Sequence, residues 1–328
     1  MFYLYSCGAT PPDKITTSET YHENGQTKHV LTYKNSVLDG PYIEYYTNGQ
    51  IKTSGIFLND LKTGEWHTYH ETGELEQSQQ YLVGKLNGEW TYYFTNGKIK
   101  QKVDYKNGYK HGEYIRFNEN GEVLSSRKYN NGKQHGEWIS HYKIGQLKYK
   151  RNYSNGVEHG LWVSYYKNGI CKYEKNYNKG MLDGKHISFY QNGQTEFISN
   201  YINGEKDGKW LYYFPDGKLW YEQNYQYSVE HGDYLEYHQN GQIKSNGNFK
   251  IGKKEGKWIS YYDNGQILEE VNYKKGYYDG QNTTYHYNGE IKSKGLWSNG
   301  KKHNIWTWYH QNGQLHEELS FKDGEISW

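Results

Sequence analysis

The histidines are the residues whose type most directly suggests chemistry, since the 328-residue chain holds 15 of them. Five precede a recurring glycine position, namely His111, His135, His159, His231 and His303. Five others follow a recurring tyrosine, namely His22, His70, His238, His286 and His310. Neighbours in each column are at least one hairpin apart, or about 10 Å by strand spacing. Because zinc holds each ligand atom at about 2 Å, we predict turn and surface histidines and no metal site.

Catalytic patterns are missing from the sequence. No GxSxG, HExxH or P-loop motif occurs, and the two cysteines, Cys7 and Cys171, are too few for a disulfide scaffold or a structural zinc site. Catalysis needs one specific set of catalytic residues gathered in a pocket, whereas this sequence repeats each of its positions. We therefore predict that the protein is not an enzyme and needs no cofactor.

A column of lysines could bind an anionic partner: Lys28, Lys52, Lys100, Lys148, Lys172, Lys244 and Lys292. With the tyrosines predicted to lie opposite, it gives a candidate binding face of Tyr45, Lys52, Tyr93, Lys100, Tyr165, Lys172, Tyr237, Lys244, Tyr285 and Lys292. Such a face suits anionic lipid headgroups or single-stranded nucleic acid. Alternatively, the lysine stems cover the tyrosine rings. We favour covering, because Glu76 and Glu196 interrupt the column and the net charge is only +2.

The element that must position these residues is a repeat of constant length. A glycine, preceded by Asn in ten of thirteen repeats, recurs every 24 residues at Gly25, Gly49, Gly73, Gly97, Gly121, Gly145, Gly169, Gly193, Gly217, Gly241, Gly265, Gly289 and Gly313. Aromatic residues, 18% of the chain, keep the same period, whereas hydrophobic residues of all kinds reach only 34%. This composition excludes a helix-rich globule and indicates a glycine-punctuated β protein.

Each repeat is predicted to be one β-hairpin. Asn48-Gly49 favours a type I′ turn, in which both residues have positive φ. That turn predicts the cross-strand pairs Tyr46–Ile51, Tyr45–Lys52, Tyr42–Gly55 and Gly40–Phe57. Side chains alternate along a strand, so Tyr45 and Lys52 should share a face, and the ring of Phe57 should cover Gly40. A second turn, such as Asn107-Gly108, should link one hairpin to the next.

The repeat resembles the bacterial MORN-variant repeat, whose signature is shown by residues 153–169, Tyr-Ser-Asn-Gly-Val-Glu-His-Gly-Leu-Trp-Val-Ser-Tyr-Tyr-Lys-Asn-Gly. The resemblance covers residues 21–328. It implies an all-β fold, an elongated antiparallel meander of about twelve 24-residue hairpins. It also implies binding to a protein, since some bacterial members are classed with antitoxin or immunity partners of secreted toxins.

Residues 1–20 lack the repeat pattern, so we predict a tail of residues 1–20 followed by one continuous array over 21–328. Within the tail, Leu4-Tyr5-Ser6-Cys7-Gly8 resembles the end of a lipoprotein signal, although Tyr5 is bulky for its place. Two interpretations stay open. Lipidation of Cys7 would anchor the protein in the cell envelope, whereas an incidental cysteine would leave it cytoplasmic.

The leading hypothesis is a non-enzymatic scaffold that binds another protein, such as a toxin, through an aromatic-rich sheet face. The alternative is a membrane-associated or surface-anchored lipoprotein, whose Lys/Tyr face contacts lipid headgroups or cell-surface partners. Nucleic acid is disfavoured as a partner, because basic charge is not in excess.

Overall fold

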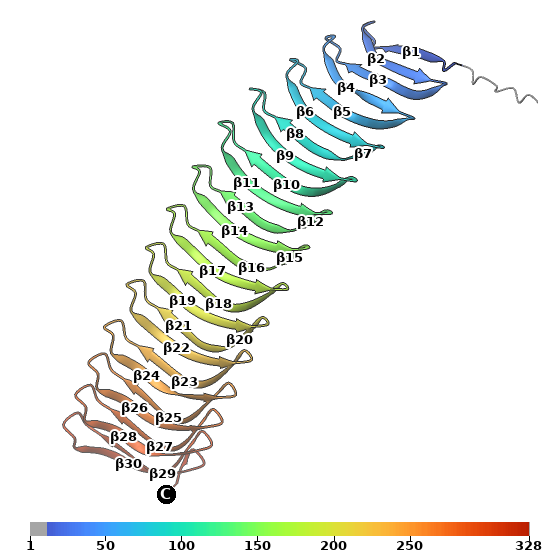
Figure 1. Cartoon of the computed structure of the whole chain (residues 1–328). Helices are drawn as coiled ribbons and strands as arrows, with labels where there is room; N and C mark the ends of the chain where they lie inside the picture. The colour runs from blue at the N-terminus through green and yellow to red at the C-terminus, as the bar shows by residue number, and fades with distance from the viewer. Residues whose placement is uncertain (1–11, 328) are drawn as a thin grey trace, which may run out of the picture. The chain divides into compact units, whose positions relative to one another are not determined.

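The computed structural model describes residues 12–327 and confirms the predicted all-β fold. These residues form 31 strands and no helix. The chain divides into two compact units, unit 1 (residues 1–157) and unit 2 (residues 158–328). Within each unit the strands follow one another in chain order and pair antiparallel, as a meander of hairpins (Figure 1).

The strands of unit 1 are β1 (Ile15–Tyr21), β2 (Thr27–Lys34), β3 (Val37–Tyr45), β4 (Ile51–Leu58), β5 (Leu61–Tyr69), β6 (Leu75–Leu82), β7 (Lys85–Leu86), β8 (Gly88–Tyr93), β9 (Ile99–Lys106), β10 (Tyr109–Phe117), β11 (Val123–Asn130), β12 (Lys133–Gln134), β13 (Gly136–His141) and β14 (Leu147–Ser154). The two-residue strand β15 (Val157–Glu158) lies at the junction. Strand β1 begins at Ile15 and is exposed along its whole length. Paired strands therefore begin six residues before Tyr21, the residue at which the aromatic pattern starts. The pattern does not extend over β1 because an exposed edge strand buries no aromatic side chain.

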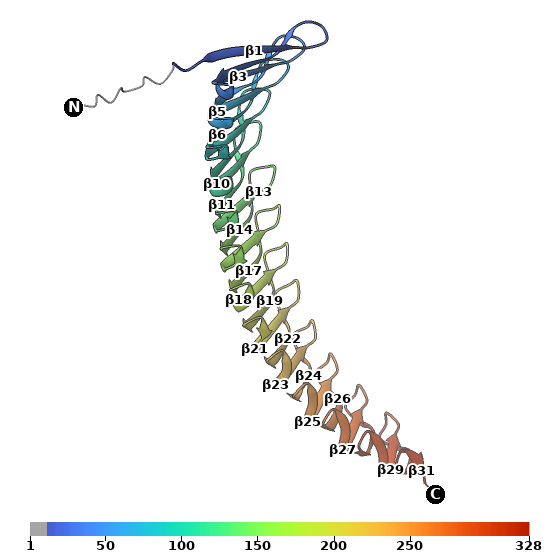
Figure 2. The ribbon, with the colours of Figure 1, turned by 90° about the vertical axis from the view of Figure 1, so that its right-hand side faces the viewer.

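The strands of unit 2 are β16 (Gly160–Tyr165), β17 (Cys171–Asn178), β18 (Met181–Phe189), β19 (Thr195–Ile202), β20 (Glu205–Lys206), β21 (Gly208–Tyr213), β22 (Leu219–Gln226), β23 (Val229–Tyr237), β24 (Ile243–Lys250), β25 (Lys253–Tyr261), β26 (Ile267–Lys274), β27 (Tyr277–Tyr285), β28 (Ile291–Ser298), β29 (Lys301–Tyr309), β30 (Leu315–Lys322) and β31 (Glu325–Ile326). Seen edge-on, each unit is a single layer of strands (Figure 2). In each unit, therefore, no second layer of described residues covers either face of the sheet.

The Asn-Gly turn differs from the predicted type I′ turn. Gly49 N–H donates to the Tyr46 carbonyl at 3.0 Å, and Tyr46 N–H donates to the Gln50 carbonyl at 2.8 Å. Gly49 has φ of 85°, whereas Asn48 is not among the residues with positive φ. This is a three-residue loop, a type I turn followed by a left-handed glycine. The predicted type I′ turn was wrong because the Asn48 side chain stabilises the type I turn instead. Its Oδ1 accepts a hydrogen bond from the Gln50 N–H at 3.0 Å.

A β-bulge next to this loop restores the expected register. Tyr45 pairs with Ile51, so the predicted Tyr46–Ile51 and Tyr45–Lys52 pairs are wrong. One residue further along, Glu44 pairs with Thr53, which leaves Lys52 as the extra residue. The predicted pairs Tyr42–Gly55 and Gly40–Phe57 are confirmed. The loop and the bulge each shift the register by one residue, in opposite directions.

Type I′ geometry occurs at the opposite edge of the sheet, in the turn that links one hairpin to the next. Asn107 and Gly108 both have positive φ, of 51° and 85°. They join β9 to β10, where Lys106 pairs with Tyr109. The linking role of this turn is confirmed.

The asparagine of the Asn-Gly dipeptide connects successive repeats. Asn48 Nδ2 donates to the Glu71 carbonyl of the next turn at 2.9 Å. Asn240 donates in the same way to the Asp263 carbonyl at 2.6 Å. Where aspartate replaces asparagine at Asp216, Lys218 Nζ instead donates to a carbonyl of the next turn, that of Gln239, at 3.0 Å. The side-chain amide is thus used twice, once within its turn and once between turns.

A ladder of aromatic rings forms the core of each unit on one face of its sheet, which we call the tryptophan face. The face is defined by its buried indoles, Trp66 and Trp138 in unit 1 and Trp162, Trp210, Trp258 and Trp306 in unit 2. The ring of Trp66 packs edge-on against Phe57 with centroids 4.9 Å apart. Its Nε1–H donates to the Ile56 carbonyl at 3.2 Å, next to a register shift in the β4–β5 pairing. The glycine directly beneath this indole is Gly55, where a Cβ would lie 2.2 Å from the Trp66 ring.

Candidate binding surfaces

The tyrosines and lysines of the predicted binding face do not meet as cross-strand partners. Lys52 Nζ lies 2.7 Å from Glu44 Oε1 and Lys244 Nζ lies 2.8 Å from Glu236 Oε1. Glu44 is on the tryptophan face, whereas Tyr45, its neighbour in β3, points to the other face. The bulge turns the Lys52 side chain away from Tyr45. The lysine column and the tyrosine column therefore lie on opposite faces of the sheet.

The rings that accompany the lysine column belong to the next residue along the chain. Lys52 Nζ lies 5.9 Å from the Tyr46 ring centroid, Lys100 5.8 Å from Phe94, and Lys172 5.6 Å from Tyr166. The tyrosines Tyr45, Tyr93, Tyr165, Tyr237 and Tyr285 are half-buried, and Lys292 is exposed. Tyr285 lines a hollow on the other face with Lys257 and Glu270.

A different set of lysines, which was not predicted from the sequence, covers four of the core indoles. Lys62, Lys206, Lys254 and Lys302 each stand four residues before a buried tryptophan, and Lys110 stands four residues before Tyr114 at the equivalent position. Lys62 Nζ lies 4.0 Å from the Trp66 centroid, and Lys254 Nζ lies 4.0 Å from the Trp258 centroid. Burial lowers the pKa of both amines. The sequence signal was a lysine four residues before the tryptophan, as in Lys62-Thr63-Gly64-Glu65-Trp66, and cation–π contact is its physical basis.

Three histidines of the column after the strand tyrosine connect repeats. His22 Nε2 lies 2.9 Å from the Tyr45 carbonyl, and His238 and His286 make the same contact with the next repeat at 2.9 and 3.0 Å. At the equivalent position the Tyr46 hydroxyl donates to the Tyr69 carbonyl at 2.8 Å. Among residues 12–327, no group of three or more His, Cys, Asp or Glu side chains could hold a metal ion.

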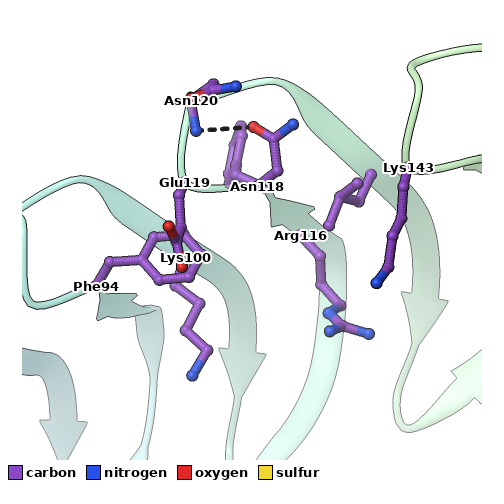
Figure 3. A pocket seen from close by; sticks show the side chains of 9 residues that line it. Phe94, Lys100, Arg116, Asn118, Glu119, Asn120 and Lys143 are labelled. Carbon is purple, nitrogen blue, oxygen red and sulfur yellow. Dashed lines mark hydrogen bonds between the residues drawn. The ribbon is translucent and has the colours of Figure 1, made fainter.

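A hollow of about 450 Å³ opens in unit 1 beside the loop after β10, and it collects basic side chains (Figure 3). Lys100, Arg116 and Lys143 line it, together with a single acidic residue, Glu119. Phe94 forms part of its wall, and Phe117 and Leu124 also contribute. In Figure 3 the side chains of Lys100, Arg116 and Lys143 extend into the same region from three neighbouring hairpins.

Unit 2 contains the same hollow at the equivalent position of its own repeats, with the opposite charge. It measures about 520 Å³ and is lined by His238, Lys244, Ser260 and Asp263, which follow Phe94, Lys100, Arg116 and Glu119 by 144 residues each, or six repeats. Glu236 also lines it and pairs with Lys244 at 2.8 Å. Tyr287 stands at the position equivalent to Lys143, and its hydroxyl donates to Asp263 Oδ1 at 3.0 Å. The basic character therefore belongs to the unit 1 hollow and not to the repeat as such.

An aromatic stretch crosses the tryptophan face of unit 2 from β19 to β23. Tyr212 and Tyr221 stack with centroids 4.4 Å apart and an angle of 16° between the rings. Phe197 lies 5.7 Å from Tyr212, and Tyr234 lies 6.2 Å from Tyr221. All four rings are only half-buried. Burial raises the pKa of Tyr212 and of Tyr221, so both hydroxyls are neutral at physiological pH.

The cysteines are placed as follows. Cys7, the predicted lipidation site, lies outside the described residues. Cys171 is half-buried, and its Sγ lies 3.6 Å from the Ser164 carbonyl. Burial raises the pKa of its thiol to about 11. In residues 12–327 no helix has the length and apolar character to cross a bilayer.

Single-layer antiparallel hairpins with a 24-residue period, an aromatic ladder and linked turns define a β-hairpin repeat scaffold. The sequence pattern described as the MORN repeat variant matches eleven stretches of this chain: residues 16–35, 38–59, 86–107, 110–131, 134–155, 158–179, 182–203, 206–227, 230–250, 254–275 and 302–323. The chain belongs to the MORN repeat variant family. This confirms the family predicted from the sequence.

Comparison with other proteins adds little beyond the family. No curated protein sequence matches the chain. Among solved structures, the TcdB2-TccC3-Cdc42 complex is similar over 94% of this chain and 18% of its own, with 12% identity and a TM-score of 0.18. The TcdB2-TccC3 structure is similar over 95% of this chain and 18% of its own, with 14% identity and a TM-score of 0.19. This chain thus spans about a fifth of the length of those chains, and TM-scores this low support no conclusion.

Proposed function

We propose that this chain is a non-catalytic scaffold that binds another protein through its tryptophan face. The observation that carries the proposal is the aromatic stretch of Phe197, Tyr212, Tyr221 and Tyr234, whose half-exposed rings lie side by side on an uncovered sheet. Aromatic residues are enriched at protein interfaces and dominate their binding energy. The mixed charge of the chain, with a net value of +2, fits a protein partner better than a polyanion.

The resemblance to bacterial MORN-variant proteins suggests a secreted toxin as the class of partner, in an antitoxin-like or immunity-like role. Its support is the family resemblance alone. The second candidate function is contact with lipid headgroups through a Lys/Tyr face, with Cys7 as the anchor. Its geometric support is weaker than the sequence suggested, because the lysine and tyrosine columns lie on opposite faces.

Isolation of the tagged protein from its source cells tests the proposal. Tyr212 and Tyr213 are consecutive in β21, so their rings point to opposite faces and provide a matched pair of variants. We expect Tyr212→Ala to lose one or more bound proteins that wild type and Tyr213→Ala retain, as measured by quantitative mass spectrometry. Equal recovery with both variants would contradict binding through the tryptophan face.

A further inference from the structure

The basic hollow of unit 1 contains cations that the protein itself does not neutralise. In the part of the chain that the structure describes, none of Lys100, Arg116 and Lys143 has a carboxylate within ion-pair distance, whereas other lysines do, such as Lys102 with Glu89 and Lys209 with Glu222. Arg116 stands in the column that holds Glu44 and Glu236, which neutralise Lys52 and Lys244 in their own hairpins. In the hairpin of Lys100 the residue equivalent to Glu44 is Tyr92, so Lys100 has no acid beside it, and Arg116 adds a further positive charge where unit 2 has Ser260.

From this arrangement we infer that the hollow binds an acidic segment of a partner protein, with neighbouring carboxylates on Lys100, Arg116 and Lys143 and an apolar side chain against Phe94. The inference rests on the proposed function, since it names the chemistry of part of the partner. Guanidinium and ammonium groups bind carboxylates by charge-assisted hydrogen bonds, and arginine does so with two parallel bonds.

The size and wall of the hollow favour a peptide over a small inorganic anion. At about 450 Å³ it is far larger than a phosphate ion, and its apolar side chains Phe94 and Leu124 would stay unoccupied by such an ion. A peptide supplies a carboxylate and an apolar group from adjacent residues. The hollow of unit 2 has Ser260 and Tyr287 in place of Arg116 and Lys143 and adds Glu236, so it should not bind the same segment.

A labelled acidic peptide tests the inference directly. The probe is fluorescein-labelled Glu-Glu-Phe-Glu-Glu, titrated with the purified full chain at low salt and followed by fluorescence anisotropy. We expect saturable binding with one site, weakened roughly tenfold or more by Arg116→Ser or Lys100→Gln, because each removes a charged hydrogen-bond donor. Lys244→Gln is the matched control and should leave binding unchanged, because Lys244 is already paired with Glu236. Circular dichroism checks that all variants fold.

A triple variant of the unit 2 hollow and two alternative ligands, inorganic phosphate and phosphatidylserine vesicles, complete the test. Glu236→Tyr with Ser260→Arg and Tyr287→Lys gives the second hollow the charges of the first and should create a second site. Absence of saturable binding to wild type, or equal weakening by Lys244→Gln and Arg116→Ser, would overturn the inference. So would tighter binding of inorganic phosphate than of the peptide, or binding of phosphatidylserine vesicles that Arg116→Ser abolishes while the peptide stays bound. Since the assay needs no native partner, its failure leaves the result with Tyr212 and Tyr213 unaffected.

Discussion

Replacing Gly247 by alanine tests the aromatic ladder at its tightest contact. A Cβ on Gly247 would lie 2.2 Å from Cδ2 and 2.3 Å from Cε2 of Trp258. Gly247 does not have a positive φ, so alanine brings no backbone strain and would, without the clash, favour the strand by about 0.5–1 kcal/mol. The sign of the effect therefore depends on whether the indole can move.

The indole has little room, because Trp258 is only 4% exposed and its Nε1–H donates to the Asn248 carbonyl at 3.2 Å. Forcing extra volume into a packed core costs about 1–3 kcal/mol, and losing the indole hydrogen bond costs about 1 kcal/mol more. After the gain in strand propensity, we expect a net loss of about 1–3 kcal/mol. Unfolding is not expected, because fully buried Ser199 occupies the equivalent position before Trp210.

Equilibrium unfolding in urea, followed by circular dichroism, measures this loss, and a double-mutant cycle isolates its cause. In the Trp258→Leu background the ring atoms that meet the new Cβ are gone. There, Gly247→Ala should cost little or should stabilise. An equal loss in the wild-type and Trp258→Leu backgrounds would refute the packing argument.

Three further predictions concern turns and titration. Asn240→Asp keeps the acceptor within the turn but loses the donor to the Asp263 carbonyl, so its urea midpoint should fall by the equivalent of about 1 kcal/mol. Gly193 has φ of 90°, so Gly193→Val should cost about 1–2 kcal/mol in the same assay, and an equal effect of Gln194→Val would refute the turn assignment. Burial, with Lys175 nearby, lowers the pKa of His186 to about 4 in the folded state from 6.5. The folded state therefore excludes a proton that the unfolded state binds, and stability that is complete above pH 6.5 is lost as the pH falls toward 4. His186→Phe should flatten this part of the stability profile between pH 7 and 5, and an unchanged slope would contradict the shifted pKa.

The constant period was enough to predict the fold, because a turn glycine and aromatic residues recur in register every 24 residues. The pairs Tyr42–Gly55 and Gly40–Phe57 were predictable for the same reason. The turn at Asn48-Gly49 was not, because its type depends on hydrogen bonds from the Asn48 side chain that compete with the type I′ preference. The loop and the bulge cancel in register, so only the residues between them were misplaced.

The candidate site was harder to predict than the fold. Alternation along a strand placed Lys52 with Tyr45, whereas the bulge turns it to Glu44, and no periodicity argument shows a bulge. The basic hollow combines Lys100, Arg116 and Lys143 from three hairpins, and the absence of an acidic partner for Lys100 is visible only by comparison with Lys244 and its partner Glu236. That comparison needs the spatial neighbours of each column, which the sequence does not display.

Photo-crosslinking in the source cells is the most direct test of the central claim that the tryptophan face binds a protein. A benzoylphenylalanine group would replace Tyr212 in one variant and Tyr213 in another, and both would be irradiated in living cells. We expect a discrete protein adduct from position 212 that is absent or much weaker at position 213. An adduct only from position 213, or no protein adduct from either position, would contradict it.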